Sequence, residues 1–301
     1  MKLRILYVFV FIGIACKNNK ESEKENNATS GATKIVNITH YPKEKHLKNV
    51  KQLTFGGDNA EAYWSFDGNK ITFQSNKKAW GLNCDQIFMM NADSVLTKGK
   101  MPKLISTGKG RTTCSYFLPG DKTIVYSSTH LVNEACPPAP KKEDHGGKYI
   151  WPVYSSFDIF VADLEGNQLK QLTHEPGYDA EPTVSPKGDK IVFTSTRSGD
   201  LELYTMNIDG SKVQQITHEL GYDGGAFFSP DGSKIIFRSS RPKTDEEIKE
   251  YKDLLTQDLV MPTNMELYIC NVDGSDLKKI TDLGSANWAP FFHPSGNKVL
   301  F

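Results

Sequence analysis

The sequence lacks a net charge and the common signatures of catalysis. Its 301 residues contain 36 Lys and Arg against 36 Asp and Glu, so the formal net charge is zero. Without an overall positive field, attraction to nucleic acid or to an anionic membrane surface is not expected. No GxSxG elbow, phosphate-binding loop, GxGxxG turn or HExxH zinc motif occurs. We therefore expect no nucleic-acid partner, no catalytic residue, no cofactor and no metal.

The sequence also lacks an apolar run long enough to span a bilayer. Its longest run, residues 5–15, follows two basic residues and ends at Cys16. A basic start, a short apolar core and a small residue before the cleavage point are typical of a secretory signal. Ala15-Cys16 resembles the cleavage site of bacterial lipoprotein signals, in which the Cys becomes the lipidated first residue. The resemblance implies a lipid on Cys16 and a periplasmic or cell-surface protein, with the outer membrane favoured.

Residues 17–48 contain few apolar side chains. The stretch from Lys17 to Lys34 is dominated by charged residues and Asn, with Ala as its one apolar residue type. Such a composition buries too little surface to fold. We predict a signal over 1–16, a flexible tether over 17–48 and a folded domain over 49–301.

The folded part consists of one repeated unit. Each copy opens with a hairpin of two short apolar strands around a turn rich in Pro, Asp, Ser and Gly. Four copies continue into a second hairpin, and three of these have a Glu-Gly or Asp-Gly turn. The interval from Pro186 to Pro230 is 44 residues, the length of a four-stranded propeller blade. The opening hairpins are Ala62–Ser75, Ser115–Ser128, Pro182–Ser195, Ala226–Ser239 and Pro290–Phe301.

These repeats predict an all-β chain folded as a β-propeller of four-stranded antiparallel blades. An open β-sandwich is the alternative, but a sandwich does not need blade-length repeats. The string from Ser229 to Thr281, with its SPDG, ELY, NxDGS and IT elements, resembles the WD-repeat-like propeller repeat of the TolB proteins and of several peptidases. TolB-type propellers have six blades. This chain shows four blades and the opening hairpin of a fifth, so we expect it to be truncated at the C-terminus.

Three of the four complete units are enlarged between their second and third strands. The insertions are residues 76–83, 130–156 and 241–264. In a propeller these connections return to the rim at which the innermost strands start. All three should therefore enlarge this one rim, the insertion-bearing rim. In the third insertion, Thr244 and the acidic residues after it predict a helix start. We expect the helix to bury its apolar stripe locally, with a partner groove as the alternative.

Polar side chains recur where the innermost strands begin. This column should lie at the insertion-bearing rim, where its carboxylates and amides could bind a cation, a sugar or a peptide terminus. The alternative is that these side chains satisfy backbone N–H groups at the strand starts. The binding candidates are Asn59, Thr112, Asp179, Asp223 and Asn287, their neighbours Arg111, Glu61 and Glu181, and Trp151 in the second insertion.

Four cysteines remain besides Cys16. Cys84, Cys114 and Cys136 should lie at the insertion-bearing rim, and an oxidising compartment would allow one bridge among them. The pair Cys84 and Cys136 is slightly favoured, because both are in long loops of adjacent blades. Cys270 lies within a predicted strand and should pack as a small hydrophobe.

The sequence thus predicts a non-catalytic, monomeric lipoprotein propeller that binds a protein, peptide or glycan of the cell envelope. The alternative is the propeller domain of a periplasmic peptidase or glycan-cleaving enzyme whose catalytic part lies beyond Phe301.

Overall fold

A computed structural model of the chain describes residues 42–97 and 99–301. The chain divides into two units, Met1–Lys34 and Ile35–Phe301, and the second contains all of the described residues. The predicted signal with Cys16, and most of the predicted tether, lie outside them. Among the described helices, none is long and apolar enough to cross a membrane.

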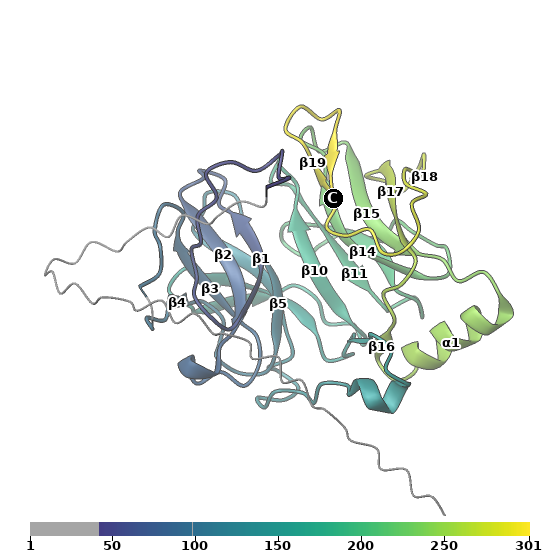
Figure 1. Cartoon of the computed structure of the whole chain (residues 1–301), viewed down its shortest axis with the longest axis horizontal. Coiled ribbons are helices and arrows are strands. Elements are labelled where there is room, and N and C mark those ends of the chain that lie inside the picture. Colours follow the sequence, from purple (N-terminus) through teal and green to yellow (C-terminus); the bar gives the residue numbers. More distant parts are fainter. Residues whose placement is uncertain (1–41, 98) are drawn as a thin grey trace, which may run out of the picture. The chain divides into compact units, whose positions relative to one another are not determined.

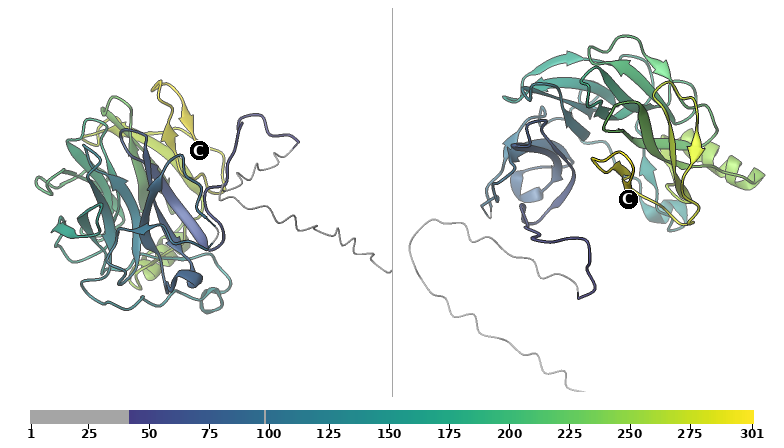
Figure 2. Two further views of the ribbon diagram at one scale, coloured as in Figure 1. Left: turned by 90° about the vertical axis from the view of Figure 1, so that its left-hand side faces the viewer. Right: turned by 90° about the horizontal axis from the view of Figure 1, so that it is seen from above.

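Four antiparallel four-stranded sheets follow one another along the chain (Figure 1). Seen from above, they succeed one another around an axis (Figure 2), and the first strands of neighbouring sheets contact each other. The predicted propeller is confirmed. The blades are β1–β4 (Asp58–Trp64, Lys70–Asn76, Gln86–Asn91, Lys103–Leu104), β5, β6, β8 and β9 (Thr112–Phe117, Thr123–Ser128, Asp158–Asp163, Gln168–Gln171), β10–β13 (Asp179–Val184, Lys190–Ser195, Glu202–Asn207, Gln214–Gln215), and β14, β15, β17 and β18 (Tyr222–Phe228, Lys234–Ser240, Met265–Asn271, Lys278–Lys279). A further hairpin, β19 (Phe291–Phe292) with β20 (Val299–Leu300), begins a fifth.

The hydrophobic core lies in layers between successive blades. Between the third and fourth blades, Val192 and Leu203 pack against Phe228, Phe237 and Cys270, all of them buried. Each blade has two faces to cover, and stacking neighbours covers both. The predicted packing of Cys270 as a small hydrophobe matches its buried place in this layer.

The repeated Ser-x-Asp-Gly turns have a local cause. In the fourth blade, the hydroxyl of Ser229 donates to Asp231 and accepts from the N–H of Lys234 at 2.9 Å. Gly232 has a φ of +66°, which glycine adopts without a steric cost. The same arrangement recurs at Ser65 and Asp67 in the first blade. These hydrogen bonds bring the first two strands of a blade together.

The insertions carry the remaining elements. The first contains η1 (Lys78–Trp80), the second η2 (Lys142–His145) and β7 (Trp151–Pro152), and the third α1 (Asp245–Leu255) and β16 (Leu259–Val260). Thr244 and Glu247 form a capping box at the start of α1, and Tyr251 and Leu254 are buried. Strands β7 and β16 pair with each other, so the insertions of the second and fourth blades meet over the insertion-bearing rim.

Candidate functional site

The two aspartates of the polar column are buried. Asp179 accepts from Arg197 at 2.8 Å, and Asp223 accepts two hydrogen bonds from Arg241 at 2.6 and 2.8 Å. Asp179 and Asp223 are 1% and 0% exposed. Burial raises the pKa of Asp223, and the hydrogen bonds and positive charge of Arg241 oppose that rise. These two carboxylates form buried ion pairs within their blades and are not exposed at the insertion-bearing rim. The expectation that they line a binding site at that rim is therefore corrected.

The other column residues bind backbone groups. Thr112 donates to the carbonyl of Asp85 at 3.0 Å and Asn287 to that of Met265 at 2.9 Å. Asn59 is exposed and donates to the carbonyls of Gly56 and Gly57. In four blade openings, the column residue's N–H also binds the preceding blade near the start of its third strand, as in Asp223 to Leu201 at 2.9 Å. The column therefore marks the junctions between blades.

A second set of equivalent positions faces the centre. Each lies two residues after the column, and all have a left-handed backbone with φ between +45° and +58°, which is uncommon for residues other than glycine. In the four complete blades a β-bulge accompanies them. These residues line one cavity of ≈ 290 Å³, the channel cavity. They are Glu61, Cys114, Glu181, Gly225 and Ala289.

Glu181 and Arg238 form the polar centre of the channel cavity. Nη2 of Arg238 donates to Oε1 of Glu181 and to the hydroxyl of Tyr222, both at 2.7 Å. Oε2 of Glu181 accepts from Thr194 and from the N–H of Gly225, each at 2.8 Å. Burial alone would raise the pKa of Glu181, but Arg238 and these hydrogen bonds outweigh burial and lower it. The carboxylate is therefore ionised and paired.

Gly224 and Gly225 make room for this network. A Cβ on Gly225 would lie 1.7 Å from Nη1 of Arg238, and one on Gly224 would lie 2.5 Å from Oε2 of Glu181. No side chain fits at either position while Arg238 and Glu181 stay in place. The Gly-Gly pair of the fourth blade thus leaves the space that the buried ion pair occupies.

Trp151 covers Arg238 from the insertion-bearing rim. Its ring lies 5.6 Å from the guanidinium and 4.9 Å from the ring of Trp288. Trp288 and Tyr222 also lie against the guanidinium, at 5.4 and 5.5 Å. Pairing of β7 with β16 holds Trp151 in this place. The structure thus brings Trp151 and Glu181 together through Arg238.

The cysteines lie in three different environments. Cys84 and Cys136 form a disulfide with 5.9 Å between their Cα atoms, joining the insertions of the first two blades. Arg111 lies beside it, paired with Asp85 at 2.6 Å. Cys114 is free and lines the channel cavity, not the rim where it was expected. Burial, with Glu61 and Glu181 nearby, raises the pKa of its thiol well above the usual value, so it is not an activated nucleophile.

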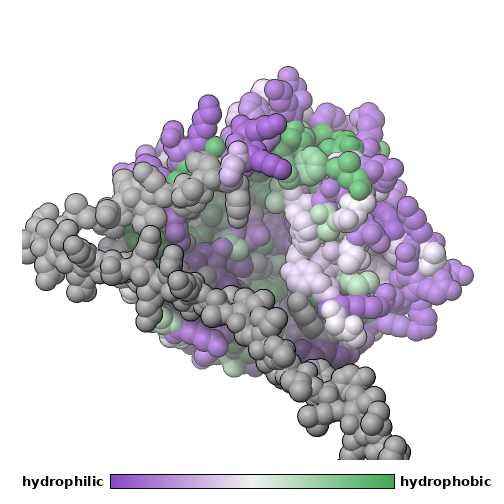
Figure 3. Space-filling model, in the orientation of Figure 1, coloured by the Kyte–Doolittle hydropathy of each residue, from purple (hydrophilic) through white to green (hydrophobic). Residues whose placement is uncertain are grey.

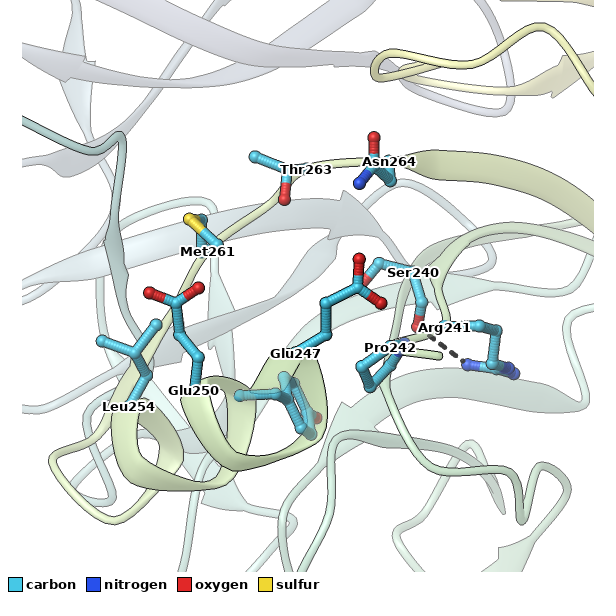
Figure 4. A pocket seen from close by; sticks show the side chains of 10 residues that line it. Ser240, Arg241, Pro242, Glu247, Glu250, Leu254, Met261, Thr263 and Asn264 are labelled. Carbon is cyan, nitrogen blue, oxygen red and sulfur yellow. Dashed lines mark hydrogen bonds between the residues drawn. The ribbon is translucent and has the colours of Figure 1, made fainter. Parts of the chain in front are cut away.

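Two other cavities lie near the two ends of the blades. A cavity of ≈ 190 Å³ lies beside α1, and the carboxylates of Glu247 and Glu250 point into it (Figure 4). Both are engaged, Glu247 in the helix cap and Glu250 with Lys148. At the opposite end of the blades, a cavity of ≈ 350 Å³ is lined mostly by aromatic residues and prolines, including Phe291. Hydrophobic side chains gather on that side of the molecule (Figure 3).

Comparison with known proteins agrees with this geometry. The model of the TolB beta propeller domain matches residues 154–257. A TolB structure from Acinetobacter baumannii superimposes with a TM-score of 0.55 at 19% identity, over 81% of this chain and 48% of that one. A structure assigned as TolB from Agrobacterium tumefaciens gives 0.54 at 21%, over 82% and 75%. The propeller is TolB-like.

The sequence match to curated TolB proteins is local. The Tol-Pal system protein TolB of Bordetella pertussis is 44% identical over 39 residues, and that of Bordetella parapertussis agrees equally. The match covers 13% of this chain and 9% of each relative. The TolB-like fold is thus shared, while the chain matches less than a tenth of the length of these relatives.

Sequence reasoning missed the centre of this TolB-like propeller. It found Glu61 and Glu181 but not Arg238, Tyr222 or Trp288. Two signals were present in the sequence. The strand position of Arg238 is occupied by Gln74, Ser127 or Thr194 in the other complete blades, and only the fourth blade has Gly-Gly where the others carry side chains.

Among the described residues, no cluster of three or more His, Cys, Asp or Glu side chains is arranged to hold a metal ion.

Proposed function

We propose that the chain is a non-catalytic, monomeric lipoprotein of the cell envelope that binds a protein, peptide or glycan at the insertion-bearing rim. A lipid on Cys16 would hold it at a membrane, with the outer membrane favoured, facing the periplasm or the cell surface. The TolB-like fold supports a binding role, and the naming of its curated relatives as Tol-Pal system proteins supports a periplasmic location.

One observation carries this proposal. The second insertion is fixed at two distant points, by the Cys84–Cys136 bridge to the first blade and by the β7–β16 pairing to the fourth. Between and beside these anchors it exposes three large apolar side chains, Leu131, Val132 and Tyr149, which are 55%, 70% and 52% exposed. Exposed apolar side chains on a fixed surface favour association, because little conformational freedom is lost on binding.

A capture experiment tests the proposal. The full chain carrying Cys16→Ser, to keep it off membranes, is used to bind partners from envelope extracts. Leu131→Ser, Val132→Ser and Tyr149→Ser together should abolish capture of the partner. The matched control is Leu169→Ser with Val213→Ser, which removes exposed apolar side chains from β9 and from the residue just before β13. If the control loses the partner and the rim variant keeps it, the rim is not the binding surface.

A further inference from the structure

We propose that the channel cavity binds a small organic ammonium group, with Glu61 as its counter-charge, an aromatic floor beside it, and Arg238 donating to an oxygen of the same ligand. The cavity lies inside the ring of first strands, so this site is separate from the surface proposed for the envelope partner. The proposal holds whether or not that partner exists.

The charged residues that line the cavity favour a cationic ligand. Glu181 and Arg238 neutralise each other, and both oxygens of Glu181 already accept hydrogen bonds. Glu61 is exposed, and Tyr63 is the one described residue whose side chain donates to its carboxylate. Among the described residues that line it, the cavity therefore carries one more negative than positive charge, which a ligand with a single positive charge would balance.

The floor of the cavity suits an organic cation better than a hydrated metal ion. The ring of Phe227 lies 5.8 Å from that of Tyr63 and 5.2 Å from that of Phe291, and all three residues line the cavity. Aromatic faces attract ammonium groups and their attached carbons. The carboxylate of Glu61 and this cluster thus offer charge and apolar contact side by side.

Arg238 supplies the second point of recognition. The residue is 9% exposed and lines the cavity, and its Nε has no hydrogen-bond partner among the described residues. Nη1 lies over Gly225, which also lines the cavity. The guanidinium therefore reaches the cavity beside Gly225, where its charged N–H groups would bind an acceptor oxygen brought by a ligand.

The cavity volume limits the ligand to the size of an amino acid. A volume of ≈ 290 Å³ corresponds to roughly ten water molecules. An α-ammonium group next to a neutral carbonyl meets both requirements, whereas a free carboxylate would restore the unbalanced negative charge. The group could belong to a free molecule or to the amino terminus of a partner chain, since the recognised chemistry is the same.

Alaninamide is the probe, and Cys114 is a built-in reporter. Calorimetry should show that the full chain binds alaninamide at least tenfold more tightly than N-acetylalaninamide, which has no ammonium charge, and more tightly than alanine. Alaninamide should also slow the alkylation of Cys114 by N-ethylmaleimide, followed by mass spectrometry. A ten-residue peptide with an amino-terminal Ala identifies the source: protection by the peptide indicates a partner terminus, and protection by alaninamide alone indicates a free molecule.

Glu61→Gln should weaken alaninamide binding at least tenfold, while the exposed control Glu165→Gln should leave it unchanged. Because Glu61 itself affects the Cys114 thiol, protection is taken as the ratio of rates with and without probe for each variant. Glu61 is exposed, so the variant should fold, which thermal unfolding checks. Equal binding of N-acetylalaninamide, unchanged binding by Glu61→Gln, or unprotected Cys114 would each overturn the proposal.

Discussion

Nη2 of Arg238, in the fourth blade, donates to Oε1 of Glu181, in the third blade, at 2.7 Å. Both side chains are largely buried, and the pair joins two blades at the centre of the propeller. It also explains why Gly225 replaces a side chain at the channel in this blade alone. One ion pair thus links the sequence of the fourth blade to the shape of the channel cavity.

Arg238→Met should destabilise the protein by about 3–5 kcal/mol, because it leaves the buried Glu181 carboxylate without its partner. Urea unfolding measures the change. The matched control is Lys103→Met, which removes the cation of the exposed pair with Glu165 and should cost less than about 1 kcal/mol. Similar small losses in both variants would show that the central pair is not a structural link.

The free energy of unfolding should fall as the pH rises from about 4.5 to about 8, because of the buried carboxyl group of Glu202. Burial raises its pKa to about 8 from the ordinary 4.5; Asp223 and Asp200 add to the rise, while Thr217 and Arg241 oppose it. Between these values the folded protein holds a proton that the unfolded chain has released, so raising the pH favours unfolding.

Glu202→Gln should flatten this dependence and make the variant the more stable protein at pH 8. Urea unfolding at several pH values provides the measurement, with the exposed Glu165→Gln as control. Parallel pH profiles for wild type and Glu202→Gln would be incompatible with a raised pKa at this position.

Removing the disulfide should lower stability and loosen the second insertion. Cys84 and Cys136 are 52 residues apart in sequence, and a loop of this length corresponds to about 4 kcal/mol in the chain-entropy treatment. Thermal unfolding of the Cys84→Ser, Cys136→Ser variant should show the loss, and Cys114→Ser serves as control. A melting temperature that does not respond to reductant in the wild type would contradict this.

The propeller was predictable because each blade specifies itself locally. Strand alternation, the Ser229-type turns and the Thr244 cap all act within a few residues, so the repeats revealed strand order, and the helix was expected where α1 forms. The helix ends at Leu255, and Leu259 pairs in β16 with a strand of the second insertion.

The channel was less predictable because its geometry depends on contacts between blades. The bulges that turn Glu61 and Cys114 inward change the strand register, and simple alternation does not reveal this. Arg238 joins residues from two blades. Asp179 is paired with Arg197, two residues beyond the end of β11, and Asp223 with Arg241, one residue beyond the end of β15. Such pairings appear only when the sheets are assembled.

The proposed membrane attachment depends on Cys16. Cys16→Ser should move the protein from the membrane fraction to the soluble fraction of fractionated cells, because the variant has no thiol to carry the proposed lipid. Cys114→Ser keeps the lipidation site and should remain with the membranes. Unchanged fractionation of Cys16→Ser would refute lipid anchoring.

Site-specific photo-crosslinking in intact cells tests whether the insertion-bearing rim is the binding surface. A photoreactive amino acid placed at Val132, on the second insertion, should form discrete adducts with an envelope component. The same group at Leu169, on the outer strand of the same blade, should form none. Adducts at Leu169 with none at Val132 would show that the insertion-bearing rim is not the binding surface.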